Sequence, residues 1–375
     1  MILVSNRKIT VQSPGRINLI GEHTDYNLGF VLPAAINKYV TVEIEERNDE
    51  LIELISINNQ QTYRTSLSEI HQSTLHWPDY ALGVVSELQK ANHSIKGFSA
   101  IISGNIPVGA GLSSSAAYEC AMVFALNEVF NLGLTKQEMV QLAQAAENNF
   151  VGLQCGIMDM FASMMGKENH AIRLDCRSLD YEYFPVVLGD FKIVLLDTQV
   201  KHSLASSEYN TRRKECEIGI NLIKQKYPSI QSLRDATLNM VNDCITDITV
   251  KKRCTFIVEE IERVLNACTL LNEGKLAEFG REMYATHNGL SRQYEVSCQE
   301  LDFLVNECLG YKEILGARMM GGGFGGCIIS LMHKDAIDNI TGRMASLYKR
   351  NMQKEMLVYV ADIVNGTNTI NKNSP

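Results

Sequence analysis

The pattern of apolar and polar residues in the first half of the chain predicts a sheet followed by helices. Residues 40–46, Val-Thr-Val-Glu-Ile-Glu-Glu, alternate between apolar and polar side chains, which is typical of a strand with one solvated face. Residues 98–102 predict a neighbouring strand. Residues 116–131 are rich in helix formers, and an apolar stripe along residues 139–150 marks a further helix.

The second half is predicted to be rich in helices around fewer strands. Residues 191–197, Phe-Lys-Ile-Val-Leu-Leu-Asp, indicate a buried strand. Apolar residues recur at helical spacing over residues 216–227 and again over residues 257–268. Residues 328–331 and 356–363 are two more strand candidates. We therefore expect a mixed α+β fold.

Length and composition narrow the class of protein. A chain of 375 residues exceeds what one hydrophobic core usually holds, so we expect two domains. The polar segment 173–182 is the expected boundary, which divides the chain into domains 1–180 and 181–375. The net charge of −8 offers no basic field for nucleic acid, so an anionic ligand must be held by a local site.

The cysteines and the lengths of the apolar segments indicate the cellular compartment of the protein. The ten cysteines form no Cys-x-x-Cys pair, which argues against a zinc ribbon or a redox dithiol. The N-terminus does not resemble a signal peptide, and no stretch approaches the roughly 20 apolar residues that span a bilayer. We expect a soluble cytoplasmic enzyme without a membrane or nucleic-acid partner, and with reduced thiols.

One glycine-serine segment has the composition of a phosphate-binding loop. It reads Pro-Val-Gly-Ala-Gly-Leu-Ser-Ser-Ser-Ala-Ala over residues 107–117. Gly109 and Gly111 allow the backbone to turn its N–H groups inward, and Ser113–Ser115 can cap a helix whose positive end faces an anion. It contains no lysine, so it is not a Walker A loop. A surface turn that opens a helix explains the segment equally well.

A second segment, residues 13–27, concentrates polar chemistry near the N-terminus. It reads Ser-Pro-Gly-Arg-Ile-Asn-Leu-Ile-Gly-Glu-His-Thr-Asp-Tyr-Asn. Carboxylates at Glu22 and Asp25 with the imidazole of His23 suit a ligand with many hydroxyl groups. Arg16 could instead face a phosphate. A solvated loop with turn or capping carboxylates, or a metal site, are the alternatives.

Asp159 is the one carboxylate in the apolar stretch that follows Glu147. Its surroundings predict burial, which makes Asp159 either the N-cap of a turn over residues 160–165 or a reactive group. Glu147 is interpreted as either a surface residue or a Mg²⁺ ligand. Farther on, Gly-Gly-Gly-Phe-Gly-Gly at residues 321–326 requires repeated positive φ angles or close packing against a loop or ligand.

In this order, the segments resemble the three motifs of the GHMP kinase superfamily and, within it, the galactokinase family. Residues 15–27 are similar to the galactokinase signature, whereas the glycine-serine loop is common to the superfamily. The similarity continues through Cys-Gly-Ile-Met-Asp at 155–159 and through residues 201–209 and 294–298 to the glycine cluster. It implies an N-terminal domain like ribosomal protein S5 domain 2 and a ferredoxin-like C-terminal domain.

The resemblance also implies an activity, which is transfer of the γ-phosphate of ATP to the anomeric C1 hydroxyl of D-galactose. This is the first committed step of galactose catabolism by the Leloir pathway. Asp159 matches the family's catalytic base, and Arg16 matches the arginine that stabilises the transition state. The implied sugar-binding residues are Glu22, His23, Thr24, Asp25, Gly156 and Tyr209.

For the nucleotide, the resemblance implies ATP and Mg²⁺ as cofactors. The matching phosphate-loop residues are Gly109, Ala110, Gly111, Leu112, Ser113, Ser114 and Ser115. Ser115 and Glu147 occupy the family's Mg²⁺ positions, and Trp77 resembles the tryptophan near the adenine. We expect a monomer.

Two alternatives and one departure accompany this interpretation. Kinases for N-acetylgalactosamine or arabinose share these motifs. Catalytically silent galactose sensors do as well, but they tend to lose phosphate-loop residues that are present here. Relatives usually have glutamine after the catalytic aspartate, where this chain has Met160, so any polar contact at that position is lost.

Overall fold

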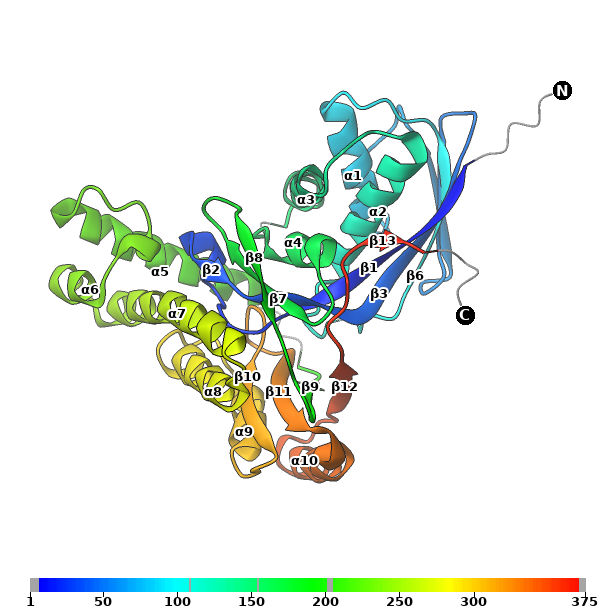
Figure 1. Cartoon of the computed structure of the whole chain (residues 1–375). Helices are drawn as coiled ribbons and strands as arrows, with labels where there is room; N and C mark the ends of the chain where they lie inside the picture. The colour runs from blue at the N-terminus through cyan, green and yellow to red at the C-terminus, as the bar shows by residue number, and fades with distance from the viewer. Residues whose placement is uncertain (1–6, 108, 154, 201–204, 371–375) are drawn as a thin grey trace.

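A computed structural model describes residues 7–107, 109–153, 155–200 and 205–370, which form three sheets and the helices around them (Figure 1). The largest sheet has six strands in the order β13-β1-β3-β6-β4-β5. Its strands are β1 (Lys8–Asn18), β3 (Pro33–Glu46), β4 (Leu51–Ser56), β5 (Gln61–Ser66), β6 (Phe98–Gly104) and β13 (Asn368–Thr369). Along β3, Val40, Val42 and Ile44 are buried, and β6 pairs with β3, which confirms both strands predicted there.

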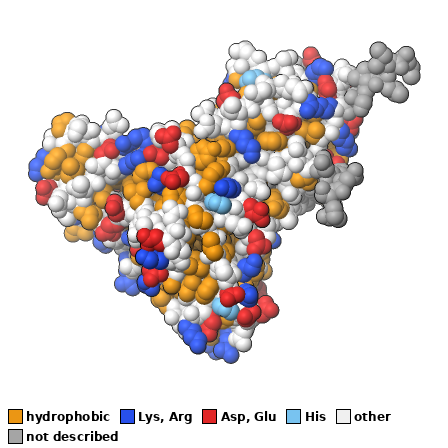
Figure 2. Space-filling model, in the orientation of Figure 1, with side chains coloured by type: hydrophobic (Ala, Val, Ile, Leu, Met, Phe, Trp, Pro, Cys, Tyr) orange, Lys and Arg blue, Asp and Glu red, His pale blue; other side chains and the backbone are white. Residues whose placement is uncertain are grey.

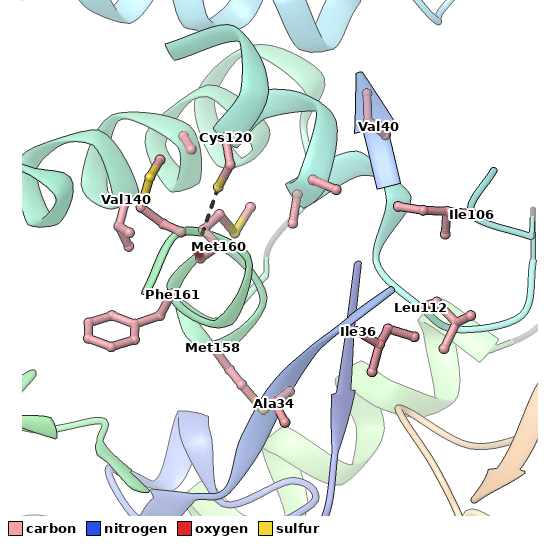
Figure 3. Close-up of a cluster of buried hydrophobic side chains, with 14 of the residues drawn as sticks. Ala34, Ile36, Val40, Ile106, Leu112, Cys120, Val140, Met158, Met160 and Phe161 are labelled. Carbon is pink, nitrogen blue, oxygen red and sulfur yellow. Dashed lines mark hydrogen bonds between the residues drawn. The ribbon is translucent and has the colours of Figure 1, made fainter. Parts of the chain in front are cut away.

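Helices cover one face of this sheet. They are α1 (Asp79–Lys90), α2 (Ser114–Phe130), α3 (Lys136–Ala145) and α4 (Met158–Met165), with a π-helical turn at Ala146–Val151 after α3. The helix α2 is buried on nearly all sides and packs on β1 and β3, so it is the centre of the N-terminal core. Figure 3 shows Met160 of α4 beside Cys120 of α2, and Met158 of α4 near Ala34 of β3.

The segment predicted as the domain boundary forms a β-hairpin. The strands β7 (His170–Asp175) and β8 (Tyr181–Pro185) pair antiparallel, and β2 (Phe30–Val31) joins β7 to complete a three-stranded sheet. Arg173 and Glu182 face each other across the hairpin with a 2.8 Å ion pair, which explains the polar composition of this segment. The division after residue 180 stays a prediction.

The C-terminal half contains a four-stranded antiparallel sheet in the order β10-β11-β9-β12. Its strands are β9 (Phe191–Asp197), β10 (Ile314–Met319), β11 (Cys327–His333) and β12 (Leu357–Ala361). The helices are α5 (Ala205–Lys226), α6 (Leu238–Cys244), α7 (Ile248–Asn272), α8 (Leu276–Arg292), α9 (Gln299–Cys308) and α10 (Ile337–Met352). The mixed α+β architecture is confirmed, as are the predicted strands in this half.

The end of the chain returns to the N-terminal sheet. After β12, Val364 N–H donates to the Ala35 carbonyl at 3.0 Å, and β13 pairs with β1. The two halves therefore share backbone pairing as well as a packed core. On the face in Figure 2, acidic and basic side chains are interspersed. Among the described residues, no helix is both long and apolar enough to cross a bilayer.

Candidate active site

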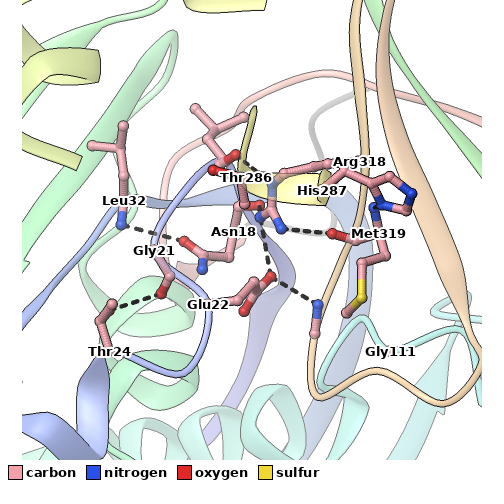
Figure 4. A network of polar contacts seen from close by, with 12 residues as sticks. Asn18, Gly21, Glu22, Thr24, Leu32, Gly111, Thr286, His287, Arg318 and Met319 are labelled. Carbon is pink, nitrogen blue, oxygen red and sulfur yellow. Dashed lines mark hydrogen bonds and ion pairs between the residues drawn. The ribbon is translucent and has the colours of Figure 1, made fainter. Parts of the chain in front are cut away.

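A cavity of about 230 Å³ lies where β1, α4, α5 and the β10–β11 loop meet. It is lined by Arg16, Gly21, Glu22, His23, Asp25, Cys155, Gly156, Met158, Asp159, Tyr209, Gly321 and Gly322. Thr24 is the one predicted sugar-site residue that does not line it. Its hydroxyl is buried and donates to the Gly21 carbonyl at 2.9 Å (Figure 4). It also donates to the Phe30 carbonyl at 2.6 Å, so Thr24 fixes the turn.

Arg16 and Asp159 form a two-pronged ion pair at one end of this cavity. Arg16 Nε donates to Asp159 Oδ1 at 2.8 Å, and Nη2 donates to Oδ2 at 3.0 Å. Both residues line the cavity, and Asp159 is the more accessible of the two, with 25 % of its side chain exposed against 7 % for Arg16. Such bidentate pairs fix the orientation of both groups. The structure thus brings together the two predicted catalytic residues.

The same arginine holds the glycine-serine loop. Arg16 Nη1 donates to the Gly111 carbonyl at 2.6 Å, and the Arg16 N–H donates to the Leu112 carbonyl at 3.2 Å. Gly109 and Gly111 have φ angles of 82° and 73°, in the region that favours glycine. Ala110 and Leu112 are buried and anchor the loop. The loop and Asp159 are therefore positioned by one side chain.

The structure does not show helix capping by Ser113 or Asp159, which was one of the alternatives for each. Ser113 occupies the N-cap position of α2 with a left-handed φ of 55°, but its side chain does not cap the helix. Its Oγ donates to Asp159 Oδ2 at 2.5 Å instead. Asp159 is not an N-cap either, because α4 begins at Met158 with Ile157 as the cap residue. The Arg16 guanidinium and the Ser113 hydroxyl instead bind the two carboxylate oxygens of Asp159.

Glu22 lies buried against the cavity and is held by the C-terminal half of the chain. Its Oε1 accepts from Arg318 Nη2 at 3.0 Å (Figure 4) and, in addition, from the Gly321 N–H at 2.8 Å. Arg318 is fully buried at the end of β10, and Gly321 opens the glycine cluster. The cluster is placed here by positive φ angles at Gly321, Gly323, Phe324, Gly325 and Gly326, as its composition predicts.

His23 belongs to a cluster of aromatic rings. Its Nδ1 forms a 2.8 Å hydrogen bond with the Tyr26 hydroxyl, which is in turn 2.8 Å from the Tyr294 hydroxyl. The Tyr209 ring lies 5.4 Å from the imidazole. Burial lowers the pKa of His23 to about 4, so the ring is neutral at pH 7. Its Nε2 is buried with no hydrogen-bond partner among the described residues, and His23 lines the cavity.

Asp25 is a carboxylate with an altered protonation equilibrium. Burial raises its pKa to about 6, and the nearby negative charges of Asp159 and Glu22 act in the same direction. At pH 7 the group is mostly ionised and accepts hydrogen bonds. Gly156 lies directly beside it. The cavity therefore presents three carboxylates and a neutral imidazole around apolar ring surfaces, an arrangement suited to a polyhydroxylated ligand.

A second cavity of about 200 Å³ lies at the start of α2, where Ser114 and Ser115 end the glycine-serine loop. Its lining includes Trp77, Tyr80, Ser114, Ser115 and Tyr118 together with apolar groups of β3 and β6. Trp77 Nε1 donates to Gln61 Oε1 at 2.7 Å, which holds the indole at the cavity wall. The two cavities share no lining residue, and Trp77, Tyr80 and Tyr118 give the second one aromatic walls.

Ser115 and Glu147, the two predicted metal residues, are in contact. Glu147 lies in the π-helical turn after α3, where burial raises the pKa of its carboxyl group, while hydrogen bonds from Cys155 and Ser115 act in the opposite direction. Among the described residues, no cluster of three or more acidic, histidine or cysteine side chains could hold a metal. A cation at Ser115 and Glu147 would need further oxygen ligands, such as phosphates.

Three protein-family models match the chain. The galactokinase galactose-binding signature matches residues 4–46, the GHMP kinases N-terminal domain matches residues 79–167, and the GHMP kinases C-terminal domain matches residues 257–350. The galactokinase of Thermotoga maritima is 40% identical over 360 residues, covering 96% of this chain and 99% of that protein. The chain belongs to the galactokinase family. GHMP kinases use ATP, so this family member is an ATP-dependent kinase.

Other members and solved structures agree with this assignment. The galactokinase of Clostridium tetani is 41% identical, over 95% of this chain and 92% of its own length. The crystal structure of Lactococcus lactis galactokinase complexed with galactose has a TM-score of 0.92 and 37% identity, over 97% of this chain and 95% of that one. Methanococcus jannaschii mevalonate kinase is 18% identical with a TM-score of 0.68, covering 97% of this chain and 100% of its own, and shares the fold.

The departure at Met160 from the galactokinase family pattern lies outside the cavity. Met160 is fully buried among apolar side chains of α2 and α3 (Figure 3). Its carbonyl accepts a 3.5 Å hydrogen bond from Cys120 Sγ. The side chain after Asp159 therefore contributes to the core, and the Arg16–Asp159 pair is intact without a polar group there.

Sequence reasoning missed several residues that shape this galactokinase-family site. Arg318 is the most buried charged group in contact with Glu22, and Tyr26 and Tyr294 support His23. The signal for Arg318 was present, because an arginine stands in an otherwise apolar strand directly before the glycine cluster. A charged residue in such a strand requires a buried partner.

Proposed function

We propose that the protein phosphorylates the C1 hydroxyl of D-galactose with ATP to give galactose 1-phosphate and ADP. The observation that carries this proposal is the bidentate Arg16–Asp159 pair in the lining of the polar cavity. A second cavity, with aromatic walls, lies at the start of α2. Galactose would occupy the polar cavity, and the adenosine moiety would occupy the aromatic one. The phosphates of ATP would then bind along the loop residues Gly109–Ser115.

In the polar cavity, sugar recognition would use groups with complementary hydrogen-bonding roles. Glu22 and Asp25 would accept hydrogen bonds from sugar hydroxyls, because ionised carboxylates are acceptors. His23 would use the ring nitrogen that has no protein partner. The Tyr209 ring would cover an apolar part of the sugar, and Gly156 would leave room for Asp25.

Phosphoryl transfer mainly requires alignment and charge stabilisation. The C1 oxygen would attack the γ-phosphorus as the bond to the β–γ bridging oxygen breaks, and ADP would leave. Asp159 would accept the C1 hydroxyl proton. Hydrogen bonds from Arg16 and Ser113 would hold the Asp159 carboxylate in orientation. Arg16 would also lower the repulsion between this carboxylate and the transferring phosphoryl group.

We propose that different groups bind the phosphates of ATP and the Mg²⁺ ion. The backbone N–H groups near Gly109 and Gly111, together with the start of α2, would bind the phosphates. Ser115 and Glu147 fit a Mg²⁺ site, since both offer oxygen ligands and they are already in contact. Bound there, the ion would neutralise phosphate charge. Trp77 would contact the adenine.

We also infer a monomer that acts in the cytoplasm. All ten cysteines are unpaired, in agreement with a reducing compartment in which ATP is available. Size-exclusion chromatography with light scattering tests the oligomeric state: a mass near 41.9 kDa supports a monomer, and a multiple of it contradicts one.

A substrate screen tests the reaction itself. Purified protein with Mg·ATP is offered galactose, N-acetylgalactosamine, arabinose, glucose and homoserine, and ADP release is followed by a coupled assay. NMR of the product identifies the phosphorylated oxygen. We expect turnover with galactose and phosphate on C1. Faster turnover with another of these compounds, or sugar binding without ADP release, would contradict the proposal.

A further inference from the structure

Arg318 is placed to control the sugar-facing carboxylate from the other half of the chain. It is the largest fully buried side chain among the described residues. Its Nε donates to the Leu19 carbonyl at 2.7 Å and its Nη1 to the Met319 carbonyl at 2.6 Å, while Nη2 reaches the Asn18 carbonyl and Glu22 (Figure 4). Glu22 is the one carboxylate among these acceptors, so it supplies the charge that a buried guanidinium needs.

The two oxygens of Glu22 have different surroundings. Oε1 accepts from Arg318 and from the Gly321 N–H, 296 and 299 positions away in the sequence. Among the described residues, no hydrogen bond to Oε2 is found, and Glu22 lines the sugar cavity. One oxygen is therefore fixed by the protein, and the other is left for a ligand.

The strand that carries Arg318 is itself held in place. The next residue, Met319, donates its N–H to His287 Nδ1 at 3.2 Å. His287 Nε2 is 3.2 Å from Asp302 Oδ1, and Asp302 also accepts from Ser297 at 2.6 Å. This chain of hydrogen bonds from α8 and α9 leaves Arg318 little freedom to follow a displaced Glu22.

We infer that Arg318 is a positioning residue: it orients Glu22 so that the carboxylate accepts a hydrogen bond from one particular hydroxyl of the sugar. By occupying Oε1, it leaves Oε2 as a hydrogen-bond acceptor with a fixed direction. The inference rests on the proposed function, since it requires the sugar to lie beside Glu22. This role differs from a purely structural one. Loss of Arg318 should change how much each sugar hydroxyl contributes to binding, and not only the stability of the protein.

Binding of galactose and its 2-, 3-, 4- and 6-deoxy analogues, measured by calorimetry, tests this inference. The wild-type protein should bind the analogue that lacks the hydroxyl read by Glu22 more weakly than galactose. In Glu22→Gln and Arg318→Lys, galactose should bind about 10-fold to 100-fold more weakly, as expected for loss of a hydrogen bond to a charged group. The penalty for that same analogue should disappear in both variants, and ATP affinity should be unchanged.

Arg253→Lys is the matched control. Arg253 is also buried, with its guanidinium bonded to Glu215, Glu295 and the Gln293 carbonyl, and it does not line the cavity. Its variant should lower the melting temperature but keep the wild-type preference among the sugars. Equal weakening of every sugar and of ATP in Arg318→Lys, or an unchanged preference, would overturn the inference.

A double variant covers the case in which Arg318→Lys does not fold. E22Q/R318M buries no charge, and its galactose affinity should equal that of Glu22→Gln alone, because Arg318 acts through Glu22. A further loss in the double variant would overturn the inference. If the wild-type protein binds no galactose, the proposed function fails and this inference fails with it, whereas normal wild-type binding with additive losses overturns the inference alone.

Discussion

Gly156 leaves free the space that the Asp25 carboxylate occupies. A Cβ atom on Gly156 would lie 2.1 Å from Asp25 Oδ2 and 3.1 Å from its Cγ, closer than side chains approach. Gly156 does not have a positive φ angle, so its backbone would accept alanine. The requirement for glycine arises from the carboxylate alone, and it couples the segment that carries Asp159 to the sugar-site turn.

Gly156→Ala should displace Asp25 and weaken galactose recognition. Because a shift of about 1 Å in a site can cost 10²-fold in rate, we expect kcat/KM for galactose to fall about 100-fold with a smaller change in KM for ATP. Steady-state kinetics with each substrate varied in turn measures this. Gly342→Ala is the control, since a Cβ there meets no atom within 4 Å and its kinetics should match the wild type.

Galactose binding should depend on pH through Asp25. Burial raises the pKa of this carboxyl group to about 6, so the group is protonated below pH 6 and ionised above it. The ionised form accepts hydrogen bonds from sugar hydroxyls, and galactose affinity should therefore rise from pH 5 to pH 7, up to about 10-fold per pH unit below the pKa. The pKa of His23, about 4, lies below this window.

Calorimetric titrations of galactose at several pH values measure this dependence. The Asp25→Asn variant should bind weakly with little change over the same range, because the titrating group is absent. A pH dependence of the same size in Asp25→Asn would assign the titration to another residue.

The sequence predicts those features that depend on interactions between residues close together in the chain. The alternation at 40–46 and the apolar stripes along α3 and α7 are periodic patterns within one element, and the structure confirms them. Motifs also identified the residues that line the cavity, since Glu22, His23 and Asp25 are adjacent in sequence. Thr24 belongs to the same motif, but its direction into the turn depends on the carbonyl of Phe30.

The errors concern contacts between distant segments. Asp159 has the local pattern of an N-cap, but its oxygens bind Arg16, 143 positions away, and Ser113, 46 positions away. The role of Arg318 likewise depends on Glu22 in the opposite half of the chain. No local propensity encodes such pairs, and single-sequence patterns therefore predicted the elements better than the partners of buried charges.

Asp159→Asn should abolish turnover while the fold is retained. The amide would keep the size of the side chain but could not accept the C1 hydroxyl proton, and we expect kcat to fall at least about 10³-fold, in the range of a lost general base. A coupled ADP-release assay measures the rate, and calorimetry should still detect ATP binding. Near-normal turnover would rule out Asp159 as the base.

Ser115→Ala should raise the Mg²⁺ concentration that activity requires. The variant removes one proposed oxygen ligand and also the hydroxyl that hydrogen-bonds Glu147, so we expect about a 10-fold higher half-saturating concentration of free Mg²⁺. ADP release at fixed ATP and varied free Mg²⁺ measures it. Ser114→Ala is the matched control, because Ser114 lines the same cavity. It should keep the wild-type Mg²⁺ curve, and an unchanged curve for Ser115→Ala would remove Ser115 from the metal site.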